Sequence, residues 1–178
     1  YSGRRLRPGI PELDASDRDY AELLRIKDRI GRGSADLEPE LERLEEIARS
    51  SPRFLEGHLL AASVALSLFE SSREIVHLER ARRAARIAAE LAPGDPRPLE
   101  SRFRIAVEGR QTGEAEEALG ALSRIIPGDP QLHVLSGLLA DSRGDLEQAV
   151  EDLSLAVRSA PSWRNLYFLA NLEDRAGR

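Results

Sequence analysis

The chain has 178 residues, of which 41% are apolar and 32% charged, and its formal net charge is −5. A negative chain is not drawn in bulk to nucleic acid or anionic lipid, and the lack of cysteine excludes disulfides, thiolate zinc sites and a cysteine nucleophile. No stretch nears the roughly 20 apolar residues that a membrane span requires. We therefore expect no nucleic-acid partner and no membrane insertion within this chain.

Residues 1–15 are predicted to form an extended leader with basic character. Arg4, Arg5 and Arg7 precede Pro8 and Pro11, and the segment shows little apolar periodicity. Because the chain begins with tyrosine rather than methionine, we expect it to be a piece of a longer protein.

The first helical hairpin is predicted between Ser16 and Pro52. Ser16 and Asp19 form a helix-start signal, and apolar residues follow at helical spacing until Gly31. A second helix is expected after Asp36, with a proline tolerated in its first turn.

Seven further helices are predicted along the rest of the chain. The stretch Glu70–Arg73 makes one repeat longer than its neighbours, so its extra residues are expected in the turn or in longer helices. Asp95 and Asp129 are predicted N-caps, each followed by a proline at the first helical position. The predicted helices cover about 53–69, 74–91, 96–110, 114–126, 130–142, 146–159 and 162–176.

Three prolines recur at a fixed interval. Pro93, Pro127 and Pro161 are 34 residues apart, and Pro-Gly-Asp-Pro occurs at both 93–96 and 127–130. A period of this length indicates stacked helical repeats, because each copy buries its apolar face against the next. Proline cannot continue a helix, so each of these prolines is expected to end the second helix of a pair.

The spacing resembles that of the tetratricopeptide repeat (TPR), a helix-turn-helix unit of 34 residues. The resemblance is good over 53–178 and weak over 16–52. Aligning Gly113 with the turn glycine Gly144 makes Pro127 arrive early, which predicts a shorter second helix and a longer turn or first helix in that repeat. The best-matching repeat has small residues where its helices would cross, a bulky residue between them and a closing proline, namely Gly137, Gly144, Ala149, Leu153, Ala156 and Pro161.

This resemblance implies an all-α fold, a right-handed α-solenoid of about four antiparallel helix pairs plus one extra helix. We expect a single solenoid domain over 16–178, with repeats at about 16–52, 53–93, 94–127, 128–161 and a partial repeat at 162–178.

The resemblance also implies a concave groove lined by the first helix of each pair, which we term the A helices, with the second helices termed B. We expect this groove to bind a peptide or a partner's helix, with Arg97 and Arg104 taking acidic side chains and Leu138, Phe168 and Leu172 taking apolar anchors. The expected groove residues are Glu56, Leu59, Ser63, Arg97, Glu100, Arg104, Gln131, Val134, Leu138, Asp141, Asn165, Phe168 and Leu172.

The histidines do not suggest a metal or catalytic site. His58 and His133 fall at the same repeat position, which favours a packing role, and His77 stands alone. No His-Glu-x-x-His motif and no phosphate-binding loop is present. We therefore expect no metal, no cofactor and no enzymatic activity.

Two surface features leave alternatives open. Arg80, Arg82, Arg83 and Arg86 share one predicted helix and are interpreted as a solvated face, with docking of an acidic partner or nucleic acid as the alternative. Trp163 begins the last helix beside two other aromatic residues. This cluster is core if further repeats follow and a surface for self-association through the C-terminal helix if they do not.

The predicted function is a non-catalytic scaffold that binds a protein or peptide partner, with the cytoplasm as the expected compartment and the periplasm as the alternative. The second hypothesis is a regulatory or sensory segment of a larger bacterial signalling protein, such as a Ser/Thr protein kinase.

Overall fold

The computed structural model describes residues 15–33 and 36–177, so nearly all of the predicted leader lies outside the described residues. Within these ranges the chain forms nine α-helices and no strand. Their bounds are α1 Asp17–Gly31, α2 Glu38–Ser50, α3 Leu55–Ser72, α4 Ile75–Leu91, α5 Pro96–Glu108, α6 Thr112–Ile125, α7 Gln131–Ser142, α8 Leu146–Ser159 and α9 Trp163–Arg175.

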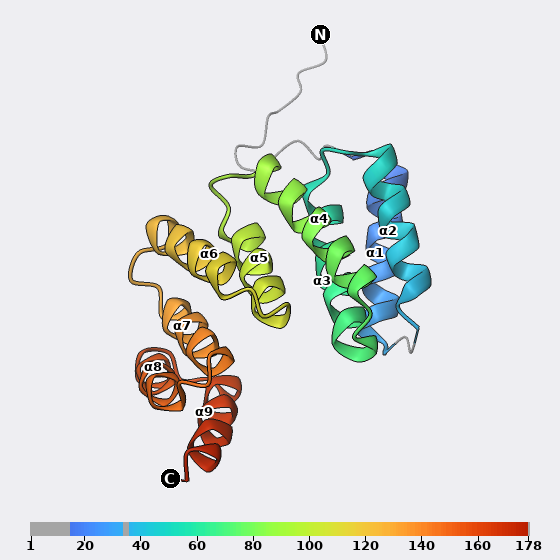
Figure 1. The fold of residues 1–178 in the computed structure, drawn as a ribbon. Coiled ribbons are helices and arrows are strands. Elements are labelled where there is room, and N and C mark those ends of the chain that lie inside the picture. The colour runs from blue at the N-terminus through green and yellow to red at the C-terminus, as the bar shows by residue number, and fades with distance from the viewer. Residues whose placement is uncertain (1–14, 34–35, 178) are drawn as a thin grey trace.

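The helices pack in chain order as a curved stack (Figure 1). Helices α3 and α4, α5 and α6, and α7 and α8 form hairpins, while α2, α4, α6 and α8 also contact the helix that follows them. The A helices α3, α5 and α7 contact one another in succession. The predicted all-α solenoid is therefore confirmed.

The predicted helix starts are largely confirmed. Ser16 Oγ accepts the N–H of Asp19 at 3.1 Å, and Asp95 Oδ1 accepts the N–H of Arg97 at 2.9 Å. Helix α7 begins at Gln131, one residue later than expected, although Asp129 Oδ1 still accepts the N–H of Gln131 at 2.8 Å. Each acidic or hydroxyl side chain thus satisfies a backbone donor that the first helical turn leaves free.

The long repeat gains its length within its helices. Helix α3 has 18 residues and α4 has 17, whereas α5 has 13 and α6 has 14. Residues 70–72, expected in the connecting stretch, belong to α3, and Arg73 turns the chain with a φ of 59°.

The prediction of a shorter second helix in the third pair is wrong. Gly113 lies inside α6, and the turn residue equivalent to Gly144 is Arg110, 34 residues earlier. Gly144 has a φ of 80° and Arg110 a φ of 55°, so an arginine occupies a left-handed position that glycine usually fills. Helices α6 and α8 consequently have the same length of 14 residues.

The apolar core consists of three clusters that adjoin along the stack. The first joins α1 to α4 and includes Ile105 of α5, the second joins α5, α6 and α7, and the third joins α7, α8 and α9. Leu138 packs against both the second and the third cluster. An added Cβ at Gly137 would lie 3.0 Å from Leu153 Cγ and 3.2 Å from Ala149 O, so this glycine permits the close approach of α7 and α8.

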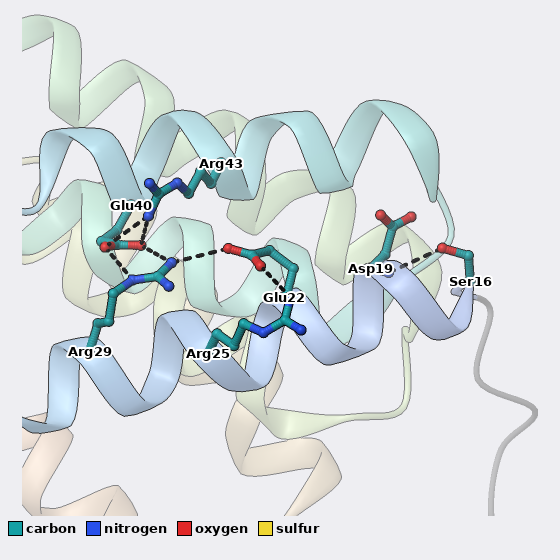
Figure 2. A network of polar contacts seen from close by, with 7 residues as sticks. All are labelled: Ser16, Asp19, Glu22, Arg25, Arg29, Glu40 and Arg43. Carbon is teal, nitrogen blue, oxygen red and sulfur yellow. Dashed lines mark hydrogen bonds and ion pairs between the residues drawn. The ribbon is translucent and has the colours of Figure 1, made fainter.

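Polar contacts hold α1 against α2 (Figure 2). Arg29 donates Nε to Glu40 Oε1 at 2.7 Å and Nη2 to Glu40 Oε2 at 2.8 Å, and it also reaches Glu22 at 3.1 Å. The hydrogen bonds from Arg29 hold the pKa of the largely buried Glu40 carboxyl below its usual value, although burial opposes this. The pair least similar to the TPR pattern is therefore fixed by a fork-shaped ion pair as well as by its core.

Candidate peptide-binding face

The A helices α3, α5, α7 and α9 present the residues that were predicted to line a groove. Helix α3 contacts α5, α5 contacts α7, and Arg175 of α9 pairs with Asp141 of α7 at 2.7 Å. The structure thus brings the predicted residues onto consecutive helices of one layer. We call this layer the A-helix face.

An ion pair between two repeats crosses the first part of this face. Arg97 of α5 donates to Glu56 of α3 at 2.7 Å and to its own cap Asp95 at 2.6 Å. The Arg97 guanidinium holds the pKa of the Asp95 carboxyl below its usual value, against the opposing effect of burial. Arg97 is therefore already engaged within the chain, whereas Leu59 is half-buried and Ser63 exposed beside this pair.

Glu100 and Arg104 lie one turn apart in the middle of the face. Burial raises the pKa of the half-buried Glu100, the carboxylate of Asp129 raises it further, and the Arg104 guanidinium opposes both. Glu100 accepts no hydrogen bond from the described residues, and Arg104 is exposed. The centre of the face thus offers one acceptor and one cation to a partner.

The apolar part of the face lies on α7 and α9. Val134 is 7% exposed and Leu172 is 4% exposed, so both belong to the third core cluster. Leu138 and Phe168 are half-buried, and the Arg164 guanidinium lies 5.5 Å from the centre of the Phe168 ring. Leu59, Leu138 and Phe168 therefore remain as the partly open apolar positions among the predicted groove residues.

The remaining predicted residues have different surroundings. Gln131 is exposed, Asn165 Nδ2 donates to Ala160 O at 3.2 Å, and Asp141 is half-buried against Arg175. Asn165 and Asp141 thus use part of their hydrogen-bonding capacity within the chain.

The arginines of α4 mostly make contacts within the chain. Arg80 donates to Glu45 at 2.8 Å and also pairs with Glu38, which fastens α4 to α2. Arg82 pairs with Glu79 at 3.0 Å and Arg86 with Glu90 at 3.2 Å. These contacts agree with the interpretation of the four arginines as an ordinary charged helix face.

A cleft of about 810 Å³ between α4, α5 and α6 was not anticipated. Its sides carry Arg82, Arg86 and Arg102 from α4 and α5 and Glu114 and Glu117 from α6. No residue predicted for the groove lines it. It depends on how neighbouring repeats tilt, and the repeat pattern does not contain that information.

Two of the three histidines, His58 and His77, are buried, and His133 is half-buried. His58 is buried, with its Nε2 2.9 Å from Pro52 O, and His77 is buried with Nδ1 3.6 Å from Glu38 Oε2. Among residues 15–33 and 36–177, no three His, Asp or Glu side chains are arranged to hold a metal ion. In the same ranges, no helix is both long and apolar enough to cross a membrane.

Comparisons with known proteins support the fold. No family model matches the chain, and a search of curated protein sequences finds no significant match. MamA residues 41 to the end, from Desulfovibrio magneticus RS-1, has a similar structure, with a TM-score of 0.67 and 21% identity over 92% of this chain and 88% of that one. A double mutant of MamA RS-1 gives a TM-score of 0.65 and 20% identity over 92% and 87% of the two chains.

A third similar structure is TTC0263, a thermophilic TPR protein in Thermus thermophilus. Its TM-score is 0.66 at 18% identity, over 88% of this chain and 90% of that one. The chain has a TPR-like fold. At these identities the likeness establishes the architecture, and the role of the A-helix face has to be argued from its own residues.

Proposed function

We propose that this chain is a non-catalytic protein-interaction module that holds a peptide or partner helix along the A-helix face. The observation that carries the proposal is the order of side chains on that face. Arg104 and Glu100 project from α5, and the half-buried Leu138 and Phe168 follow on α7 and α9. Charged and apolar contact points thus lie on successive helices of one layer.

The chemistry of the partner follows from this order. An amphipathic segment would place an acidic side chain at Arg104 and apolar side chains at Leu138 and Phe168. Because Arg97 is held by Asp95 and Glu56, Arg104 is the arginine available to a partner's carboxylate at this part of the face. Glu100 accepts no hydrogen bond from the described residues, so a donor on the partner would complete its environment.

The test uses a matched pair of charge reversals on one helix. Arg102 and Arg104 are both exposed on α5, but two positions on a helix differ by about 200°, so they lie on opposite sides. Peptides selected from a random phage-displayed library against the 178-residue chain would be measured by fluorescence anisotropy. We expect Arg104→Glu to weaken binding by about tenfold, which corresponds to about 1.4 kcal/mol, and Arg102→Glu to leave it unchanged.

The proposal fails if Arg102→Glu weakens binding while Arg104→Glu does not, since the peptides would then occupy the cleft between α4, α5 and α6. It also fails if the two variants are indistinguishable. Circular dichroism of both proteins confirms that neither change alters the helical content.

A further inference from the structure

A mainly apolar cavity of about 280 Å³ lies among α2, α3 and α4. Each of these helices contributes one alanine to its lining, namely Ala48, Ala61 and Ala84, and Leu41 and Ile87 add larger apolar surface. Alanine side chains leave space between packed helices that leucine or isoleucine would fill. The volume is close to the lower end of the range for small-molecule sites, about 300–1,000 Å³. The cavity is therefore suited to one compact apolar group.

Two arginines that line this cavity have no partner within the chain. Arg49 of α2 and Arg83 of α4 are exposed, and neither makes a hydrogen bond or an ion pair with residues 15–33 and 36–177. The third lining arginine, Arg80, is engaged by Glu45 and Glu38. The two helices that flank the cavity thus each supply a guanidinium that is free to bind an anion.

The carboxylates of α2 and α4 do not neutralise these two arginines. Glu79 and Glu90 pair with other arginines and line the neighbouring cleft between α4, α5 and α6. Glu46 lines a separate hollow against α1, and Glu42 does not line the cavity. Among the described residues that line the cavity, Glu45 is the one carboxylate, and it is already paired. The open charge at the cavity is therefore positive.

The equivalent place between the next repeats has a different character. The closing prolines are 41 residues apart from Pro52 to Pro93 and 34 apart from Pro93 to Pro127, and these offsets map the cavity onto the cleft between α4, α5 and α6. In that cleft, arginines replace apolar residues and glutamates replace the two open arginines. The replacements are Leu41 by Arg82, Ala61 by Arg102, Arg49 by Glu90 and Arg83 by Glu117. The apolar lining beside two open arginines is thus a property of these side chains and not of the repeat fold as such.

We propose that this cavity binds a small carboxylic acid with an apolar body. The apolar body lies among the three alanines, and the carboxylate binds Arg49 and Arg83. Arginine can hold a carboxylate through two parallel N–H donors, and burial of the apolar body supplies further free energy. His58 also lines the cavity, but its Nε2 lies 2.9 Å from Pro52 O, so the two arginines are the cationic donors open to the ligand.

The size of the cavity favours a small molecule over a partner's helix, because it has room for one apolar group and not for a row of side chains. No residue predicted for the groove lines it. The proposal therefore does not depend on the A-helix face, and either site can fail without the other.

Octanoate is the probe, followed through the amide chemical shifts of the isotope-labelled 178-residue chain. The amides of Ala48, Ala61 and Ala84 are expected to shift, with half-saturation at about 1 mM for a ligand of this size. Acetate lacks the apolar body and should cause no saturable shift. Octanol lacks the charge and should bind about fivefold more weakly.

Two results of this titration overturn the proposal. The first is octanoate that shifts none of the three alanine amides. The second is octanol that binds as tightly as octanoate, because the cavity would then take a neutral apolar group, such as a side chain of a protein partner.

Charge-removing substitutions locate the carboxylate. Arg49→Gln and Arg83→Gln should each weaken octanoate binding about threefold. Arg86→Gln is the matched control and should leave binding unchanged, since Arg86 is exposed one turn from Arg83 but lines the neighbouring cleft and not this cavity. Arg83 lines both sites, so Arg49→Gln is the deciding variant. Unchanged binding in Arg49→Gln rejects the proposal, and weakening by both Arg83→Gln and Arg86→Gln would then place octanoate in the cleft.

A cavity-filling substitution tests the apolar part. Ala48 is half-buried, and Ala48→Leu should abolish the saturable shifts of Ala61 and Ala84 because the leucine side chain occupies the space. Ala89→Leu is the matched control, at the equivalent half-buried position of the neighbouring cleft, and should leave octanoate binding unchanged. Circular dichroism checks the folding of both proteins, and the Arg49→Gln result decides if Ala48→Leu loses helical content. Undiminished octanoate binding by folded Ala48→Leu overturns the proposal.

Discussion

The two halves of the stack are stabilised by different means. In α1–α4 one apolar cluster spans four helices, and buried polar groups such as Glu40 and Asp19 join α1 to the chain beside it. In α5–α9 two smaller clusters share α7, and close helix crossings depend on small residues such as Gly137 and Ala149.

A close match to the TPR pattern does not by itself mean a larger apolar core. The half α5–α9, which lies wholly within the range that matches the TPR pattern, has two smaller clusters. The half α1–α4, which contains the poorly matching α1–α2 pair and the better-matching α3–α4 pair, has the larger core and the forked Arg29–Glu40 pair. We therefore expect a core substitution in α5–α9 to destabilise the helices around it strongly and the distant helices less.

The largest effect is expected from Phe103→Ala. Phe103 is 0% exposed and belongs to the cluster of α5, α6 and α7. Its truncation should reduce the free energy of unfolding by about 3–5 kcal/mol, measured by guanidinium denaturation. Repeats contact only their neighbours, so hydrogen exchange should quicken in α5–α7 and change less in α1 and α2.

The matched control is Leu44→Ala, at a 0% exposed position of α2. It should quicken exchange in α1–α4 and leave α8 protected. If the two variants quicken exchange equally everywhere, the halves unfold as one unit and the comparison is wrong.

A smaller effect is expected from Gly137→Val. The added atoms meet Leu153 Cγ and the carbonyl oxygen of Ala149, so overpacking should cost about 1–3 kcal/mol. Gly120→Val in α6 is the control, because an added Cβ there has its nearest neighbour 3.9 Å away, in the flexible Arg124 side chain. We expect this control to change stability by less than about 1 kcal/mol. If both variants lose the same free energy of unfolding, the close approach of α7 and α8 does not depend on Gly137.

The sequence predicts the helices and their stacking because their signals are local. The proline period places each helix end, and Ser16 and Asp95 mark helix starts that the structure contains. The repeat pattern places the turn of the third pair at Gly113 and not at Arg110, because glycine usually fills the left-handed position that an arginine occupies here.

The contacts and burial of residues on the A-helix face could be predicted less well than the fold. Repeat alignment placed Glu56 and Arg97 on adjacent helices but did not show that they pair with each other. It also placed Val134 and Leu172 in the groove, although the packing of α8 and α9 buries both. Contacts between repeats depend on tilt and side-chain length, which a pattern within one repeat does not record.

The smallest expected effect is a loosening of α1 in acid. Hydrogen bonds from Ser51 and Ser50 keep the pKa of Asp19 below its usual value, and those from Arg29 do the same for the pKa of Glu40. Carboxyls with a lowered folded-state pKa stabilise the fold above their unfolded values and lose that contribution as the pH falls through the folded ones. Glu100 of α5 has a raised pKa, so its protonation relieves the folded state instead.

We therefore expect acid to loosen the two halves of the stack to different extents. Below about pH 5, hydrogen exchange corrected for its intrinsic rate should quicken most in α1 and α2. It should quicken less in α5, where the lowered pKa of Asp95 and the raised pKa of Glu100 have opposite effects. Glu40→Gln should already exchange faster in α1 at neutral pH and respond less to acid, because one of the protonating carboxyls is gone. If α5 loosens before α1, the carboxylates at the α1–α2 contact do not set the acid response, and the N-terminal half depends on its apolar cluster alone.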